Sequence, residues 1–276
     1  MSLRSFIEAV DGVASKRITV VSDDAPGPLQ GMLAETFDEQ PVDVDSADAI
    51  ERPAGDLDPD VAATLKSADE TAVLFEDGTP TAASSMADLY ESILAVNSDL
   101  FVSGARGLGE IELPDVLAGL EDTRLRLRGY PLAHKEKLLL ILVSRYIEQL
   151  AWLGEAGTIR SAFQKLSRID DEIGTRRVYG KLDRAGVDVH VYGVDDGLDV
   201  PFEPTVHAGT EPRYRNSWFV VYRPDGAPTD RAGALVCLED EPRIWDGFFT
   251  FEPDRVAAID EAISAEFGPA VDTGPR

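Results

Sequence analysis

The sequence predicts a mixed α/β fold in two regions. Residues 1–129 are expected to form a small α/β layer, and 130–267 a helical segment followed by a mostly antiparallel or mixed sheet with a final helix. Three observations support this. Short β-branched runs alternate with helical spacings near the N-terminus, a long apolar segment lies in the middle, and strictly alternating runs dominate the last third. Residues 268–276 are expected to be a flexible tail.

The N-terminal region is expected to alternate strands with helices. The run RITVVS at Arg17–Ser22 is β-branched and is followed by an Asp/Pro/Gly turn, which predicts a strand. Apolar residues recur at helical intervals over Ser84–Val96. The other expected elements are helices at Ser5–Val10 and Leu29–Phe37, strands at Pro41–Val44 and Thr71–Phe75, and a loop over 45–60. This alternation predicts parallel strands.

The central segment is expected to be helical. Before it, Arg124, Arg126 and Arg128 alternate with leucines, as in a strand with one solvated face. Leu138–Val143 contains six successive apolar residues, which predicts a long buried helix that ends at Gly154–Gly157. Two further helices are expected: one with Ile159, Ala162, Phe163 and Leu166 on a single stripe, and one carrying Val178, Tyr179 and Leu182 that ends at Gly186.

The last third is expected to be rich in strands. Val187–Tyr192 alternates apolar and polar residues strictly, which predicts a half-buried strand. Three more strands are expected at Trp218–Tyr222, Ala234–Leu238 and Ile244–Phe251. Pro253 suits the first turn of a final helix, whose inward residues would be Val256, Ile259 and Ile263.

The composition is strongly acidic. The chain has 51 Asp and Glu, 26 Lys and Arg, and a net charge of −25; only 6 of the bases are Lys. Such a surface repels nucleic acid and anionic lipid, and it is typical of a salt-adapted, halophilic cytoplasm. No stretch is apolar enough to span a bilayer and no secretion signal is visible, so no membrane partner and a cytoplasmic location are expected. Within 132–184 the balance reverses, with 10 bases and 7 acids. This segment either packs against acidic neighbours or binds an anion or a partner.

Known catalytic and cofactor motifs are missing. The sequence has no phosphate-binding GxxxxGK[ST], no HExxH, no GxSxG and no CxxC. The glycines of the GxxGxG at 104–109 are interpreted as turn residues, and His134, His190 and His207 lack metal-ligand spacing. The single cysteine, Cys237, is expected to be a small buried residue. No cofactor and no metal are predicted.

The candidate ligand site is the polar face of the strand Val187–Tyr192. Its valines share one face, so Asp188, His190 and Tyr192 share the other, where they line a cleft or are hydrogen-bonded in the core. Trp218 on a neighbouring strand is a further candidate. The basic candidates are Arg168, Arg176 and Arg177. Arg168 forms a polar cluster with the acids at 170–172, which either cap a helix or serve acid/base chemistry. Arg176 and Arg177 either clamp an anion or pair with the same acids.

The C-terminal part resembles the DICT sensory domain family, over about residues 130–267. The resemblance rests on the order of four segments: FQKLSRIDDEIGTRRVYGKLDRAGVDVHVYG (163–193), WFVVYRP (218–224), ALVCLEDEP (234–242) and GFFTFEPDRVAAI (247–259). That family occurs beside diguanylate cyclase and two-component modules, and as stand-alone haloarchaeal proteins. It implies a non-catalytic signal-transduction role, and it supplies no catalytic residues.

Three functions therefore remain open. The first is a sensory module that binds a small ligand or a signalling protein such as a kinase or transcription regulator, with a homodimer as one compatible assembly. The second is an enzyme acting on an anionic substrate with Arg168, the acids at 170–172 and His190. The third is a structural adaptor that uses the helices at 132–184.

Overall fold

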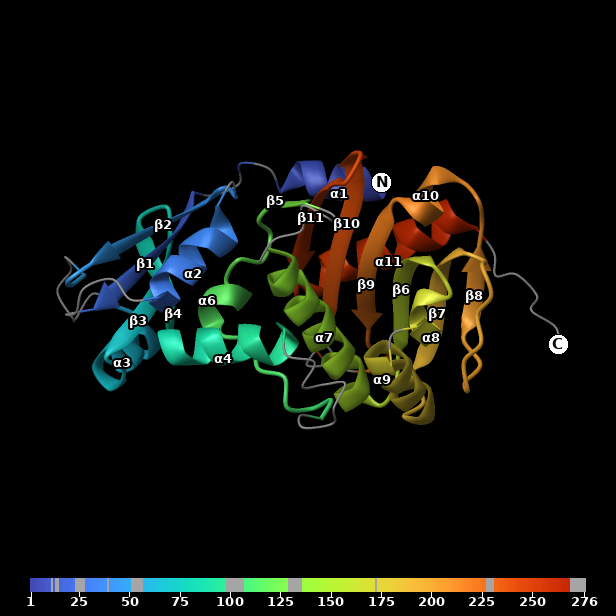
Figure 1. The fold of residues 1–276 in the computed structure, drawn as a ribbon, viewed down its shortest axis with the longest axis horizontal. Helices are drawn as coiled ribbons and strands as arrows, with labels where there is room; N and C mark the ends of the chain where they lie inside the picture. The colour runs from blue at the N-terminus through green and yellow to red at the C-terminus, as the bar shows by residue number, and fades with distance from the viewer. Residues whose placement is uncertain are drawn as a thin grey trace.

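Two mixed sheets and the helices packed around them make up the protein, which confirms the mixed α/β class (Figure 1). The computed structural model describes residues 1–10, 12, 15–22, 28–38, 40–50, 57–97, 107–128, 136–171, 173–226 and 231–268. Two predictions concern residues outside these ranges: the tail after Gly268, and His134.

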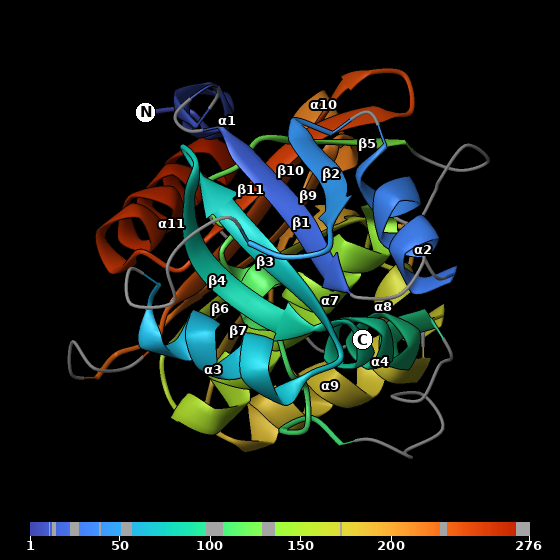
Figure 2. The same cartoon turned by 90° about the vertical axis from the view of Figure 1, so that its left-hand side faces the viewer.

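The N-terminal sheet has four strands in the order β2-β1-β3-β4 (Figure 2). The strands are β1 (Lys16–Ser22), β2 (Val42–Ala47), β3 (Glu70–Glu76) and β4 (Thr79–Ser85), with helices α2 (Pro28–Phe37), α3 (Pro59–Ser67) and α4 (Met86–Asn97). Only β1 and β2 pair in parallel, as predicted; β3 is antiparallel to both of its neighbours. Asp77 and Gly78, both at positive φ, form the tight hairpin turn that reverses the chain there.

Two N-terminal elements were missed by the sequence analysis. Strand β4 is rich in Ala, Ser and Thr and lacks the apolar run that marks β3. Helix α3 begins inside the segment interpreted as a loop over 45–60. It starts with Pro59 after Asp58, whose carboxylate accepts the Asp60 backbone N–H.

The C-terminal sheet has seven strands in the order β5-β11-β10-β9-β6-β7-β8. They are β5 (Leu125–Arg128), β6 (Thr158–Lys165), β7 (Asp188–Val194), β8 (Thr205–Ala208), β9 (Ser217–Arg223), β10 (Gly233–Glu241) and β11 (Ile244–Thr250). Strands β6, β7 and β8 pair in parallel, and the other pairs are antiparallel. The sheet is therefore mixed, as expected.

The prediction of a helix carrying Ile159 and Phe163 is wrong, because this segment is strand β6 in the middle of the sheet. β6 pairs with β9 on one side and β7 on the other, and helices cover both sheet faces. Apolar residues are therefore buried on both sides of the strand, and the period-two pattern is lost. Their spacing matches a helical stripe by coincidence.

Helices cover both faces of the large sheet. Helices α1 (Leu3–Ala9) and α11 (Pro253–Phe267) pack on one face, and α7 (Glu136–Gly154) and α9 (Ile173–Arg184) on the other. Short helices α6 (Asp115–Ala118), α8 (Arg168–Asp171) and α10 (Pro212–Arg215) complete the described elements. Val256, Ile259 and Ile263 of α11 are fully buried, as predicted.

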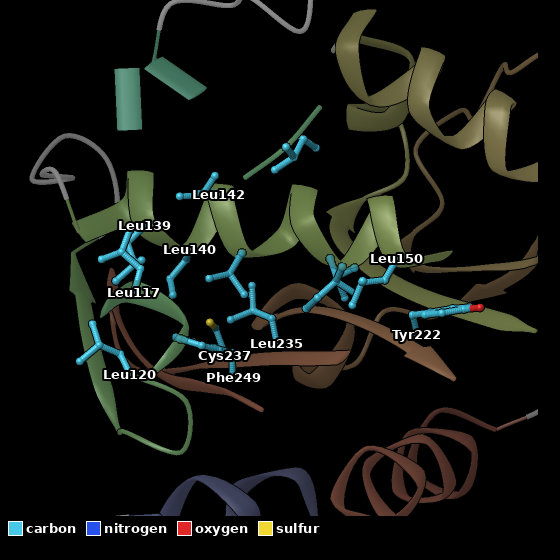
Figure 3. Packing of buried hydrophobic residues seen from close by; sticks show 14 of the residues in the cluster. Leu117, Leu120, Leu139, Leu140, Leu142, Leu150, Tyr222, Leu235, Cys237 and Phe249 are labelled. Carbon is cyan, nitrogen blue, oxygen red and sulfur yellow. The ribbon is translucent and has the colours of Figure 1, made fainter. Parts of the chain in front are cut away.

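Helix α7 connects the two halves of the molecule. It packs on the large sheet and on α4 of the N-terminal half, between the two sheets (Figure 1). Figure 3 shows Leu140 directed toward Cys237 of the sheet, whereas Leu142 points to the opposite side of the helix. One continuous core thus runs from Ile18 to Phe249. Both α1 and β5, within the expected region 1–129, pack on the C-terminal half.

Candidate functional site

The predicted site residues lie on opposite faces of the large sheet. Ser161 of β6 pairs with both Val191 and Val220, so these three side chains point to the α7 face. By alternation Trp218 also points to that face, whereas His190 and Tyr192 point to the α11 face. A single cleft containing Trp218, His190 and Tyr192 is therefore contradicted, and the two faces hold two separate polar features.

On the α7 face, a cavity of about 450 Å³ lies between helix α7, the sheet and the segment around α8. One stripe of α7 faces it, formed by Lys137, Ile141, Ser144, Arg145 and Glu148 at helical spacing. The sheet contributes the two half-buried rings of Trp218 and Trp245. They lie on the same face because Trp218 is opposite Cys237 and Trp245 is opposite Glu239, two positions along β10.

Buried polar groups line the α7–α9 side of this cavity. Arg145 donates from Nη1 to Oε2 of Glu148 at 2.6 Å and from Nη2 to Oγ1 of Thr175 at 3.0 Å. The Glu148 side chain is only 4% exposed, so a partner for its carboxylate is obligatory. Next to this pair, Tyr179 donates to Ser161 at 2.6 Å. Burial, and then the Glu148 charge, raise the pKa of Tyr179 well above its usual value, so it stays a neutral donor.

The cavity rim is cationic. Arg128, Lys137, Arg168 and Arg243 line it from four different elements or turns. Arg168 donates to the side chain of Gln164. The Arg243 backbone N–H donates to Oε1 of Glu239 at 2.8 Å, which fixes the turn between β10 and β11 at positive φ.

On the α11 face, His190 belongs to a compact hydrogen-bonded cluster. Arg160 donates to Oδ1 of Asp260 at 2.5 Å and to the Tyr192 hydroxyl at 2.7 Å, and its Nη1 lies 3.1 Å from Nδ1 of His190. The ring of His207 stacks on Tyr192, with centroids 4.3 Å apart. Burial raises the pKa of Tyr192 to about 12. Tyr192 is fully buried, so of the two alternatives for this strand face, a side chain hydrogen-bonded in the core is the one that applies to Tyr192.

The remaining candidate residues belong neither to the cavity on the α7 face nor to the His190 cluster on the α11 face. Arg176 is exposed and pairs with Asp170 at 2.6 Å, so the two predicted groups neutralise each other. Arg177 is exposed on α9. Glu172 lies outside the described residues. Cys237 is fully buried, as expected, and burial raises the pKa of its thiol.

Sequence reasoning missed the polar residues of α7. In the sequence analysis this helix was described only as long and buried, and neither Arg145 nor Glu148 was singled out. Two opposite charges three residues apart inside an otherwise apolar helix are themselves a signal, because a buried helix carries such a pair only where something partners it. Arg160 was missed because its strand was interpreted as a helix.

Comparisons with known proteins give no assignment. No family model matches the chain, and searches of curated proteins and of solved structures find no match either. Within the described ranges, no helix is long and apolar enough to cross a membrane. The same residues contain no group of three or more His, Cys, Asp or Glu side chains arranged to hold a metal ion.

Proposed function

We propose that this chain is a non-catalytic sensory module that binds a small ligand in the cavity beneath α7. The cavity itself is the observation that supports the proposal. Its volume of about 450 Å³ falls in the range of small-molecule sites, and its lining combines tryptophan rings and aliphatic side chains with many polar and charged groups. The resemblance of residues 130–267 to DICT sensory domains agrees with such a role.

Helix α7 gives the ligand a route to the rest of the molecule. The stripe of α7 that contains Ile141 and Arg145 faces the cavity, and the helix also packs against α4 of the N-terminal half. A ligand that prefers one position of α7 shifts the population of that position by its difference in affinity. A kinase or transcription regulator would then bind the N-terminal half and recognise its change in position.

The two alternatives receive less support. The enzyme hypothesis joined Arg168 with His190, but Arg168 lines the cavity on the α7 face and His190 points to the α11 face. The adaptor hypothesis needs exposed apolar residues on the helices at 132–184. Among the described large apolar side chains of these helices, Leu153 at the end of α7 is the one that is exposed.

Mass spectrometry of small molecules released from the purified protein tests the proposal. The protein is prepared in molar KCl, denatured, and compared with Ile141→Trp and Ser144→Leu, which fill the cavity. Leu153→Trp is the matched control, because it adds the same ring to α7 at an exposed position. We expect one molecule at near-stoichiometric amount from the wild type and from Leu153→Trp, and much less from the two filled variants.

Two results would contradict the proposal. One is that the well-folded wild type releases no molecule and that no metabolite from a cell extract raises its melting temperature. The other is that the bound molecule is chemically converted by the protein, which would make the chain an enzyme.

A further inference from the structure

The cavity reverses the charge balance of the chain. Over the whole sequence acidic residues outnumber basic ones about two to one, at 51 to 26. Of the residues that line the cavity, five are Arg or Lys and two are Glu. In a chain with a net charge of −25, a concave surface of opposite sign focuses a positive potential. A negatively charged molecule is therefore the complementary occupant.

Two of these cations have no ion-pair partner within the part of the chain that the structure describes. Arg145 is neutralised by Glu148 at 2.6 Å, and Arg168 is held by Gln164. By contrast, the ammonium group of Lys137 and the guanidinium group of Arg243 have no ion-pair partner among the residues that the structure describes. Glu239 accepts the Arg243 backbone N–H and leaves the guanidinium group itself available.

The sheet wall of the cavity favours a flat apolar body. Trp218 and Trp245 come from β9 and β11 and lie on either side of β10, facing α7. Leu127 and Ile141 add aliphatic surface nearby. Indole faces stack well on planar rings and give large contact area at low cost in side-chain entropy. The cations line the same cavity, so one molecule can contact both features.

We infer that the cavity binds a small aromatic or heteroaromatic anion, whose carboxylate or phosphate is held by Lys137 and Arg243 and whose ring packs on Trp218 and Trp245. This inference rests on the proposed ligand-binding function and names the ligand class of the same cavity. A carboxylate and a phosphate share the recognition chemistry, because both accept charge-assisted hydrogen bonds from Lys and Arg.

Calorimetric titration with three probes that share one ring system tests the inference. The probes are 2-naphthoate, 2-naphthyl phosphate and the neutral 2-naphthamide, titrated in molar KCl after exhaustive dialysis of the protein. We expect the better of the two anions to bind at least tenfold more tightly than the amide. The anion that binds more tightly shows whether the cavity prefers a carboxylate or a phosphate.

Two variants assign the charge, and a third is the control. Lys137→Gln and Arg243→Gln should each weaken binding of the preferred anion about threefold to tenfold and leave the amide unchanged. Lys181→Gln on α9 removes an equal charge from an exposed position outside the cavity lining and should change neither affinity.

The inference fails if the amide binds as tightly as the anions, if the double variant Lys137→Gln/Arg243→Gln keeps the wild-type affinity for anions, or if none of the probes binds. These outcomes are distinct from failure of the proposed function. Release of a neutral molecule from the purified protein would preserve ligand binding and would overturn only the anion inference.

Discussion

The imidazole rings of His190 and His207 face each other across β7 and β8, with Nδ1 of His190 2.9 Å from Nε2 of His207. The other nitrogens of both rings face acceptors: the Asp188 carboxylate at 2.9 Å from His190, and the Gly268 carbonyl at 3.2 Å from His207. If both rings are neutral and donate to these acceptors, two lone pairs meet between the rings. Arg160 compensates in part, because its Nη1 lies 3.1 Å from the same His190 nitrogen and can donate to it.

One further proton on His207 would complete the contact between the rings, but it would place a second cation beside Arg160. Burial, and then the charge of His190, lower the pKa of His207 from its usual 6.5. Between its usual pKa of 6.5 and the lowered value, His207 therefore binds fewer protons in the folded state than in the unfolded state. The free energy of unfolding should fall as the pH decreases through 6.5 toward the lowered pKa.

Urea unfolding of the wild type and of His207→Gln between pH 8 and pH 5.5 measures this effect. Glutamine cannot titrate, so we expect a shallower loss of stability in His207→Gln than in the wild type. A substitution at the exposed Arg213, such as Arg213→Gln, should leave the wild-type slope unchanged. Equal slopes for the wild type and His207→Gln would show that His207 does not cause the acid sensitivity.

The substitution His190→Ala separates a structural role from a ligand-binding role. It removes an acceptor of Arg160 and the partner of His207, both in a half-buried cluster, so we expect a loss of about 1–3 kcal/mol in unfolding free energy. Because His190 points to the face opposite the cavity, binding of 2-naphthoate should be unaffected. Thermal melts with and without this probe give both quantities. A loss of probe binding at unchanged stability would return His190 to the ligand site.

Elements whose sequence keeps a clear polar/apolar period could be predicted from the sequence. The strand at Val187–Tyr192 and the helix after Pro253 show clear alternation or a clear stripe, and both formed as expected. The strand Thr158–Lys165 could not be identified in this way, because both of its faces are covered and its period is hidden. Which neighbour a strand pairs with is also not encoded locally, so the antiparallel β3 was missed.

The candidate site was predictable only in part. Alternation correctly placed His190 and Tyr192 on one face, but it cannot relate that face to the face of Trp218 on another strand. That relation depends on the pairing register, in which Ser161 is opposite both Val191 and Val220. The cavity also needs α7 to lie across the sheet, which is a tertiary arrangement. Arg145 and Glu148 were visible as buried charges, but their partners were not.

The substitution Asp260→Asn should strongly destabilise the α11 face. The Asp260 carboxylate, 7% exposed, accepts from Arg160 at 2.5 Å and pairs with Arg223 at 3.1 Å. Without this charge the Arg160 guanidinium is left buried without compensation, and we expect a loss of about 3 kcal/mol. The exposed pair Arg213–Glu211 provides the control: Glu211→Gln should change the unfolding free energy by less than about 1 kcal/mol. Chemical denaturation compares the two variants, and equal losses would contradict the argument.

The thiol of Cys237 should be unreactive in the folded protein. Its side chain is fully buried under α7, and burial raises the pKa of the thiol, so little nucleophilic thiolate forms at neutral pH. An aromatic disulfide reagent should therefore label Cys237 only as fast as the protein unfolds, and labelling should accelerate in denaturant together with the loss of structure. Rapid stoichiometric labelling of the folded protein would show that the site opens locally.

The large negative charge should make the stability depend on salt. With a net charge of −25, the acidic side chains at the surface repel one another, and this repulsion weakens as the Debye length falls from about 8 Å at 0.15 M salt to about 3 Å at 1 M. Unfolding moves the charges apart, so low salt favours the unfolded chain. The buried Arg160–Asp260 pair is screened much less and should contribute little to this dependence.

We expect the melting temperature to rise steadily between 0.15 M and 2 M KCl. The triple variant Asp43→Asn/Asp69→Asn/Glu203→Gln removes three negative charges from exposed positions in both halves of the protein. It should melt at a higher temperature than the wild type in 0.15 M KCl, and the difference should shrink toward 2 M because screening replaces the effect of the substitutions. Repulsion is not the cause of salt dependence if the variant and the wild type respond to KCl in parallel, since salt would then act through apolar burial alone.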